Sequence, residues 1–542
     1  MATSILSIGQ SALSAAQVGI SVTGHNIANA STPGYSRQEV VQRAAEAQDF
    51  GFGYLGQGAQ VSQIRRAYND IIAQQMNRAQ NVSSSTNTYA SQLKQIDNML
   101  ADSTAGLSPS MQNFFAGIQN LATNPGDAAT RQAVLSSGQT IVNRFQSIND
   151  RINEIRQGVN TQLQNDTKVV TSYATEIAKL NDVISKAIGA NKNSAPNDVM
   201  DKRDNLIAEM NKFIKTDVIK QDDGSYNVFI GNGVPLVVGN KSYAITTVSS
   251  STDPTELEVA YVTNVVKPLG ANSLTGGSIG GLTQFRNESL DSVQNQIGQI
   301  ATVFAQTFND QHKLGFDSNG VAGGNFFNVS TPKIYSDTAN SSGATLTTTI
   351  SNVSAITSSD YRVKYDGTNY NITKVSDGSI QSFSSLPQTL DGLTFNGGSM
   401  VAGDSFLVEP VRDGAKTISL AINDIRKIAA GDATGGAGNN RNALLLAGLQ
   451  SKGTLNNSSI SYEGAFAQLV SQVGIKTNEL RVNAEADTAI LAQTTAAQQS
   501  ESGVNLDEEA TNLLRYQQAY QAAGKVMQIA STLFDLLLTI GR

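Results

Sequence analysis

The chain has 542 residues, long enough for several domains, and its formal net charge at pH 7 is −7. Charged residues make up 15% of the chain, below the usual roughly 25%, and no basic stripe is present, which argues against nucleic acid as a partner. Cysteine is absent, which excludes disulfides and thiolate chemistry.

The first 29 residues predict an apolar helix with a seven-residue repeat. No charged residue precedes Arg37, and the segment has no basic region of the kind that begins a secretory signal peptide. Ser and Gln interrupt every apolar run, so we expect no membrane insertion. Small residues occupy the alternate seam positions Gly9, Ala16 and Thr23. The large apolar residues at heptad spacing are Leu6, Leu13, Ile20 and Ile27.

A turn and a short strand are predicted to follow this helix. The helix is expected to end near Asn29, and Pro33 and Gly34 occupy the central positions of a type II turn. Residues 36–43 predict a short strand, and repeated glycines over 51–58 predict an irregular, hairpin-like stretch.

A long helical body is predicted over residues 86–213. Helices are indicated near 93–100 and 111–121, and another begins near Asp127 after Pro125–Gly126. Over 141–187 the apolar spacing alternates between four and three, which predicts one helix of about 45 residues, roughly 70 Å long. No chemistry is expected of it, although Asp166 interrupts its apolar seam.

The pattern changes after this body. Residues 218–266 predict strands that begin with a hairpin, and Gly276–Gly281 predicts a linker into a helix over 285–308. Residues 330–411 are rich in Ser, Thr, Asn and Gly and predict a β domain inserted between helices. Helices are expected to resume over 418–428 and from 462 to about 500. Turns of the β domain are expected at Asp366–Gly367, Asp377–Gly378, Asp391–Gly392 and Asn396–Gly397.

The last forty residues predict a second heptad helix. Asn505 can cap its first turn, and Glu508 is placed to close a capping box. Two heptad helices at opposite ends predict one coiled coil made of both; the alternative is two unrelated amphipathic helices packed on a core. The seam of the second helix consists of Leu506, Leu513, Tyr520, Met527 and Phe534, with Tyr516, Ala523, Ala530 and Leu537 at the alternate positions.

Two stretches of sequence resemble a known family. TGHNIANASTPGYSRQ, residues 23–38, resembles the N-terminal signature of the bacterial flagellar rod, hook and hook-associated proteins, and SGVNLDEEATNLLRYQQAYQAAGKVMQ, residues 502–528, resembles their C-terminal signature. The helical body, including LKQIDNMLADSTAGLSPSMQNFFAGIQNLATNP, is similar to the hook-associated members rather than to the mostly β hook and rod proteins. The N-terminal signature residues are Asn26, Ile27, Ala28, Asn29, Pro33, Gly34 and Tyr35.

The resemblance and the residue patterns together imply a mainly α fold with β structure. Terminal heptad helices form a coiled coil, a long helical bundle with β hairpins forms the body, and a β domain is inserted into it. The expected segments are a terminal core of 1–60 and 501–542, a helical body of 61–329 with its return half at 416–500, and the inserted β domain at 330–415.

The function that the resemblance implies is structural. It is that of an adaptor at the junction between hook and filament, whose partners are copies of itself in a ring, the hook protein and the next hook-associated junction protein. The two terminal seams would make the assembly contacts, and a cytoplasmic chaperone would bind the C-terminal seam before type III export to the cell exterior. The alternatives are another flagellar axial protein, a surface adhesin that uses the β domain, and an enzyme with a site in that domain.

No enzyme, metal or cofactor site is expected. The only histidines, His25 and His312, lie far apart in the sequence, and helix capping explains the acidic run 507–509. Residues 317–320 resemble the start of a calcium loop but lack the spacing and the closing Glu, so a β-turn is expected there. The glycine run at 276–281 lacks the Gly-Lys-Ser/Thr ending of a phosphate loop.

Overall fold

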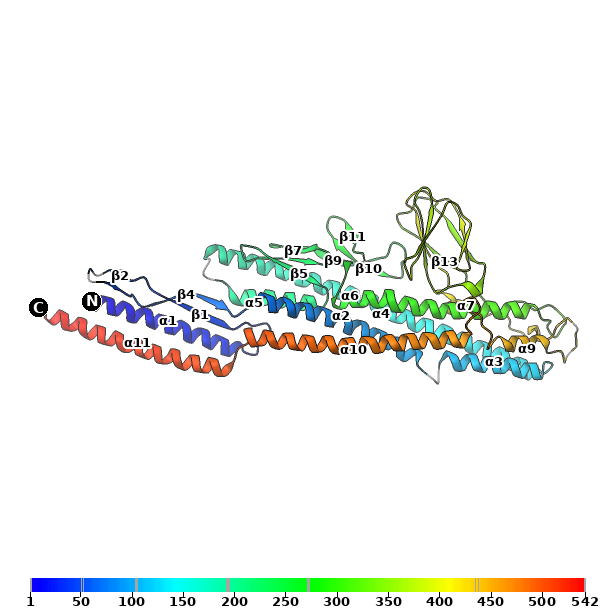
Figure 1. The fold of residues 1–542 in the computed structure, drawn as a ribbon, viewed down its shortest axis with the longest axis horizontal. Coiled ribbons are helices and arrows are strands. Elements are labelled where there is room, and N and C mark those ends of the chain that lie inside the picture. Colours follow the sequence, from blue (N-terminus) through cyan, green and yellow to red (C-terminus); the bar gives the residue numbers. More distant parts are fainter. Residues whose placement is uncertain are drawn as a thin grey trace.

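The protein is elongated, with both chain ends at the same end of the molecule (Figure 1). The computed structural model describes residues 2–49, 51, 53–102, 106–191, 195–270, 273–433, 435–436 and 438–540, without the side chains of 2–4, 537, 538 and 540. Within this part of the chain the structure is mainly helical, with several small antiparallel sheets, as the sequence predicts.

The helices are α1 (Ala2–Asn29), α2 (Asp70–Leu100), α3 (Leu107–Thr123), α4 (Ala128–Ala190), α5 (Asn197–Asn211), α6 (Gly277–Gln284), a π-helical segment (Phe285–Leu290), α7 (Asp291–Lys313), α8 (Gly414–Thr417), α9 (Arg441–Gly448), α10 (Tyr462–Ser502) and α11 (Leu506–Ile540). Short 3₁₀ turns cover Val353–Ala355 and Ile425–Lys427.

The strands are β1 (Gln38–Ala44), β2 (Gln48–Asp49), β3 (Tyr54–Leu55), β4 (Ala59–Arg66), β5 (Thr216–Lys220), β6 (Tyr226–Ile230), β7 (Val234–Val238), β8 (Lys241–Ser242), β9 (Ala244–Ser249), β10 (Leu257–Val262), β11 (Val266–Pro268), β12 (Phe327–Asn328), β13 (Lys333–Ser336), β14 (Leu346–Ile350), β15 (Tyr361–Tyr365), β16 (Tyr370–Lys374), β17 (Ile380–Phe383), β18 (Gln388–Leu390), β19 (Leu393–Gly397), β20 (Ser405–Glu409) and β21 (Ser419–Leu420).

A bundle of long helices, here called the helical frame (α2, α3, α4, α6, α7 and α10), carries the main core (Figure 1). Its longest member, α4, has 63 residues and is about 95 Å long. It is longer than predicted because the helix expected near Asp127 and the helix expected from Ile141 are one uninterrupted element, capped by the Asp127 carboxylate on Thr130 N–H. A fully buried aromatic group joins α3, α7 and β12: Phe114, Phe304, Phe308, Phe326 and Phe327.

The glycine run at 276–281 is not the predicted linker. It forms the buried helix α6, which begins at Gly277. A Cβ atom on Gly281 would lie 2.4 Å from the backbone oxygen of Ser85 in α2. The glycines therefore allow two helix backbones to approach closely, and this close packing outweighs the low helix propensity of glycine.

The helix predicted over 418–428 is also absent, and a short helix that was not predicted, α9, follows it. Residues 419–420 pair instead as β21 with β12, and Ala421 N–H donates to the Phe326 carbonyl at 2.8 Å. The guanidinium group of Arg131 donates to the carbonyls of Ile425 and Ile428. These tertiary hydrogen bonds take up backbone groups that a helix would have to pair internally.

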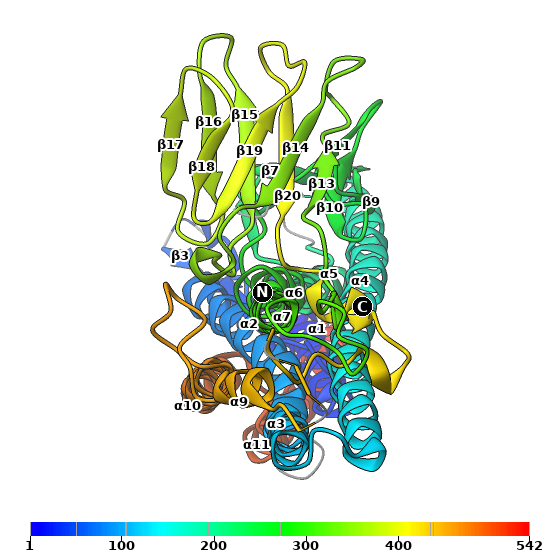
Figure 2. The same cartoon turned by 90° about the vertical axis from the view of Figure 1, so that its right-hand side faces the viewer.

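Residues 333–409, here called the insert, form two antiparallel sheets that project from the frame (Figure 2). The strand orders are β13-β20-β15-β16-β17 and β14-β19-β18. Gly367, Gly378 and Gly392 have positive φ angles at three hairpin turns, as predicted. The turn predicted at Asn396–Gly397 is wrong, because both residues lie in β19 and pair with β14.

The sheets β5–β8 and β9–β11 lie along the frame next to α4 and α5 (Figure 1). They are anchored by polar side chains of α4. Asn181 donates to the carbonyls of Tyr226 and Gly239, and Thr171 bonds both backbone groups of Ile245. These bonds fix the sheets against the long helix.

Candidate assembly surface

The two ends of the chain pack together as an antiparallel pair of helices, α1 and α11, here called the terminal coil (Figure 1). Gly9 faces the Met527 side chain, and Gly19 faces the Tyr516 ring. Ala523 and Ala530 are buried on the same side of α11. The contact between the helices thus places small residues of α1 against Met527 and Tyr516 of α11, beside the buried Ala523 and Ala530, and the small residues allow close approach.

The larger heptad residues other than Met527 and Tyr516 lie beside this contact and are partly or wholly exposed. Leu6 and Ile27 on α1 are exposed, and Leu13 and Ile20 are half-buried. On α11, Leu506, Tyr520 and Phe534 are exposed, Leu513, Tyr516 and Met527 are half-buried, and the Leu537 side chain lies outside the described residues. The structure therefore leaves most of the predicted seams open to a second contact.

A further apolar row lies on α11 that the heptad pattern did not identify. Its residues recur at spacings of three and four, so they share one face of the helix. Between Lys525 and Asp535 α11 carries no charge. An exposed apolar row of this length is typical of a protein interaction site. The row, here called the outer stripe, consists of Val526 (37% exposed), Ile529 (59%), Leu533 (42%) and Leu536 (56%).

The segment Ile5–Asn29 would suffice, by length and hydropathy alone, to cross a membrane. In this structure its small-residue side packs on α11, and Thr23 and Asn26 are buried polar residues within it. The prediction that it does not insert into a membrane stays a prediction.

The signature residue Asn26 joins α1 to two other segments of the chain. Its side chain is 1% exposed and makes four hydrogen bonds. Its amide group donates to the Gln38 carbonyl at 2.9 Å and to Glu509 Oε2 at 3.1 Å. Its oxygen accepts from the Tyr35 hydroxyl at 2.7 Å and from Gln38 N–H at 2.9 Å. Asn26 thus connects α1, the strand β1 and the start of α11, and we call this group the Asn26 junction.

Arg37 strengthens the same connection from the loop before β1. Its backbone N–H donates to the Ser502 carbonyl at 2.9 Å, and its guanidinium group pairs with Glu508 at 2.7 Å. Asn505 caps α11 as predicted, accepting from Asp507 N–H at 3.0 Å. The predicted capping box is wrong, because the Glu508 carboxylate turns to Arg37. Glu509, attributed from the sequence to capping alone, is buried against Asn26.

The signature turn connects this junction to the body. Tyr35 N–H donates to the Thr32 carbonyl, and Gly34 has a φ angle of +76°, as a type II turn requires. Ser36 N–H then donates to the buried Asp201 of α5, whose carboxylate also pairs with Arg66 at 2.6 Å. Asp201 and Arg66 therefore tie the turn to the frame, although no local sequence signal identified them.

The phenol of Tyr35 stays a hydrogen-bond donor across the physiological pH range. Burial, with Asp198, Asp201 and Glu509 nearby, raises the pKa of this hydroxyl above its usual value. The remaining signature residues Ile27, Ala28 and Pro33 are exposed, and Asn29 is half-buried and donates to the His25 carbonyl. The signature thus contains both residues that fix the junction and residues that face outward.

Both histidines contact other groups of the chain. His25 lies half-buried against the edge of the Tyr35 ring, 3.6 Å from an Asp198 oxygen. His312 is fully buried, and burial lowers its pKa. Its Nδ1 bonds the Gly324 carbonyl, and its Nε2 accepts from Ala429 N–H. In the described part of the chain, no group of three or more His, Cys, Asp or Glu side chains could hold a metal ion.

The close approach of α1 and α11 gives a direct test of the terminal coil. A Cβ atom at Gly19 would lie 2.5 Å from the Tyr516 ring, so Gly19→Ala is expected to destabilise the coil by about 1–3 kcal/mol. The matched control is Gly24→Ala, because nothing lies within 4 Å of a Cβ atom there. That change is expected to stabilise α1 by roughly 0.5–1 kcal/mol. Hydrogen exchange of the α1 amides measures the effect of each variant. Equal exchange rates in Gly19→Ala and Gly24→Ala would contradict this packing.

Four family models match the chain. The flagellar hook-associated protein FlgK helical domain matches residues 93–327, and the D2-like domain of flagellar hook-associated protein 1 matches 335–410. The flagella basal body rod protein model matches 6–35, and the C-terminal model of the flagellar basal body rod FlgEFG proteins matches 498–540.

Similar proteins cover nearly the whole chain. Flagellar hook-associated protein 1 of Escherichia coli K12 is 35% identical over 547 residues, covering 99% of this chain and 100% of that protein. The same protein of Salmonella typhimurium LT2 is 35% identical, with coverages of 99% and 100%. The solved structure of the flagellar hook junction protein FlgK from Burkholderia pseudomallei is 28% identical and has a TM-score of 0.75. It covers 79% of this chain and 100% of its own.

Proposed function

Since the chain belongs to the flagellar hook-associated protein 1 (FlgK) family, we propose that it forms the junction between hook and filament in a bacterial flagellum. It is a structural, extracellular component of the flagellum. Because its relatives are flagellar hook-associated proteins, we assign it a structural rather than a catalytic role.

The observation that carries this proposal is the apolar surface of the terminal coil. The contact between α1 and α11 uses the small residues and leaves the outer stripe exposed on one flank of α11, with Leu506, Leu513 and Tyr520 on another. A subunit within a tube needs apolar contacts on more than one side of each terminal helix, and Ile5, Leu6 and Ile8 widen the face of α1. We propose that copies of the chain form a ring through these surfaces.

The hook protein and the next hook-associated junction protein are the proposed neighbours of this ring. The proposed division of labour follows the sequence segments. Residues 1–60 and 501–542 form the assembling core, 61–329 and 416–500 form the body, and 330–415 form the outward domain. Two sets of contacts support this division: the Asn26 junction joins the two halves of the core, and the Ser36 N–H donates to Asp201 of the body.

Before export, a cytoplasmic chaperone is proposed to cover the same α11 residues. An exposed apolar helix invites aggregation in the cytoplasm, and covering it until export would prevent this. Export is proposed to follow the flagellar type III pathway.

Electron microscopy of a strain lacking the protein tests the junction role. Cells are expected to carry hooks of normal form and no filaments, because flagellin would have no surface on which to grow. Expression of the intact chain from a plasmid is expected to restore filaments. Normal filaments in the deletion strain would overturn the proposal and favour the adhesin.

A further inference from the structure

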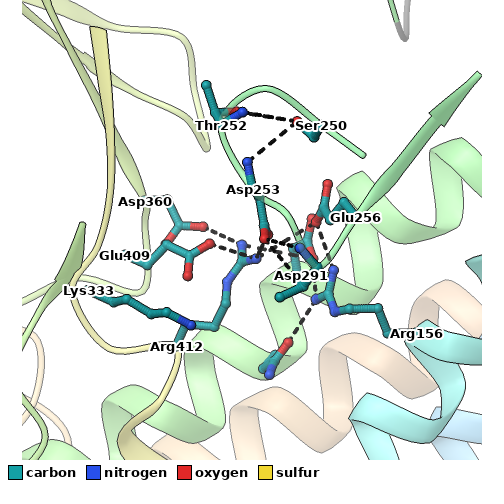
Figure 3. Close-up of polar contacts among 12 residues, drawn as sticks. Arg156, Ser250, Thr252, Asp253, Glu256, Asp291, Lys333, Asp360, Glu409 and Arg412 are labelled. Carbon is teal, nitrogen blue, oxygen red and sulfur yellow. Dashed lines mark hydrogen bonds and ion pairs between the residues drawn. The ribbon is translucent and has the colours of Figure 1, made fainter. Parts of the chain in front are cut away.

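The insert meets the helical frame at a buried cluster of charged side chains (Figure 3). The frame and the loops attached to it contribute three carboxylates and three guanidinium groups, and the insert contributes two more carboxylates. The frame side consists of Arg156, Asp253, Glu256, Arg286, Asp291 and Arg412, and the insert side of Asp360 and Glu409.

Arg412 is the centre of this cluster. Its guanidinium group lies 2.7 Å from Asp360, 2.9 Å from Glu409 and 3.1 Å from Asp253. It also lies 3.8 Å from Glu256 and 3.9 Å from Asp291. One cation is therefore shared among five carboxylates that come from both sides of the joint.

The positive and negative charges on the frame side balance each other without the insert. Arg156 of α4 pairs with Glu256 at 2.8 Å and with Asp291 at 2.6 Å, and Arg286 lies 3.6 Å from Glu256. With Arg412 and Asp253, three guanidinium groups face three carboxylates. The two insert carboxylates are thus in excess.

The nearby cation Lys333 offsets this excess only in part. The side chains of Asp360 and Glu409 are 7% and 1% exposed. Lys333 of β13 flanks Glu409 (Figure 3), and its ammonium group also pairs with Asp413 at 3.5 Å. Within the described residues, Asp360 Oδ1 has no hydrogen-bond partner. Two unneutralised carboxylates in so buried a place would be strongly destabilising.

We propose that this joint is a proton-operated latch, which is closed while carboxyl groups of the cluster hold protons and loosens when they ionise. Six members of the cluster line a cavity of about 750 Å³ between the insert, α7 and the loop before β10: Asp253, Glu256, Arg286, Asp291, Asp360 and Arg412. Protons can therefore reach Glu256 and Asp360 from the solvent while the domains stay folded, and Glu409 lies behind them against Arg412.

The shifts in pKa agree with this geometry. Burial raises the pKa of Glu409 to about 8, assisted by Asp360 and Asp253 and opposed by Arg412 and Lys333. Burial raises the pKa of Glu256 to about 7, assisted by Asp291 and opposed by the three arginines.

The pKa values of Asp360 and Asp291 shift in opposite directions. Burial, with Asp291 nearby, raises the pKa of Asp360 against the effect of Arg412 and Asn295. At Asp291, burial raises the pKa, but Arg156, Arg412 and Arg286 outweigh this effect and lower the pKa below its usual value. The proton-holding groups are therefore Glu409, Glu256 and Asp360.

The sign of the pH dependence follows from these directions. A carboxyl group whose pKa is raised by folding binds a proton that the open state releases. The closed joint is therefore most stable at acidic pH and loses stability as the pH rises through about 7 to 8. For each proton released, the open population grows by up to about tenfold per pH unit.

Distance measurements on the full-length chain test the latch. Because the chain contains no cysteine, Gln157→Cys on α4 and Gln381→Cys on β17 can be spin-labelled as a unique pair of exposed sites. Pulsed electron paramagnetic resonance is expected to give one narrow distance distribution at pH 6 and a broader one at pH 9. An unchanged distribution between these pH values would overturn the proposal.

Amide substitutions then identify the groups that hold the protons. Glu409→Gln mimics the protonated carboxyl group and is expected to keep the distribution narrow at pH 9. Asp377→Asn, in an exposed turn of the insert, is the control and is expected to respond as the unsubstituted protein does. If Glu409→Gln does not fold, Asp360→Asn is judged in the same way. A response of the folded variant equal to that of the unsubstituted protein would overturn the assignment.

Discussion

Replacing Ile529 with aspartate is expected to abolish filament growth while leaving the melting temperature of the free subunit unchanged within about a degree. Ile529 is 59% exposed at the centre of the outer stripe, so the isolated chain loses little packing. In an assembled ring, burial of this side chain would contribute about 1.5–3 kcal/mol per subunit. Aspartate removes that gain and adds several kcal/mol for a charge in an apolar contact. The same loss recurs in every subunit of the ring.

The matched control is Gln528→Asp, which adds the same charge on an exposed polar position of the same helix. It is expected to support filaments. Because the proposed chaperone covers the same apolar residues, secretion of the Ile529 variant can fall as well. Adding purified variant outside cells that lack the protein separates assembly from secretion. Restored filament growth by Ile529→Asp in that experiment would show that the outer stripe is not the assembly contact.

Met527→Asp tests the contact between α1 and α11 within one chain, although Met527 belongs to the predicted seam. Its side chain packs on Gly9 within the terminal coil. A charge there is expected to separate α1 from α11 before any neighbour is involved. Ile529 is 59% exposed, so its variant reports on contacts between subunits.

The long elements of the fold could be predicted because their residues repeat at helical spacing over many turns. This holds for α4, α10 and α11, where periodicity and a local cap define the helix. The helix over the glycine run of α6 could not be predicted from periodicity, since it depends on close packing against the backbone of Ser85 in α2. The helix prediction for residues 418–428 was wrong for a similar reason, because the distant Arg131 donates to the carbonyls of Ile425 and Ile428.

The candidate site was predicted in part. Heptad spacing identified both terminal helices, but spacing alone does not say which row of a helix meets its partner. The outer stripe was not predicted because it extends only from Val526 to Leu536. The contact of Glu509 with Asn26 was not predicted because helix capping already explained an acidic residue at that position. The charged joint of the insert gave no local signal, since its members come from segments far apart in the chain.

Replacing Asn26 with aspartate is expected to release α1 from β1 and from the start of α11 at neutral pH. Aspartate has the same shape as asparagine, but an ionised carboxylate cannot donate to the Gln38 carbonyl or to Glu509. Two carboxylates would then lie about 3 Å apart in a buried site, at a cost of about 3–5 kcal/mol. Hydrogen exchange of the α1 amides is expected to accelerate, while the amides of α4 keep their protection.

The pH dependence of this variant distinguishes charge repulsion from a general packing defect. Two neighbouring buried carboxyl groups raise each other's pKa, so the folded variant holds a proton that the unfolded chain releases. On acidification, that proton restores one hydrogen-bond donor between the carboxyl groups at positions 26 and 509. The loss of hydrogen-exchange protection in α1 is therefore expected to shrink as the pH falls. Asn29→Asp is the matched control, because Asn29 is half-buried and bonds only within its own turn and the next. It is expected to cost less than about 1 kcal/mol. If Asn26→Asp kept full protection of α1 at pH 8, the junction would not be what holds α1 to β1 and to the start of α11.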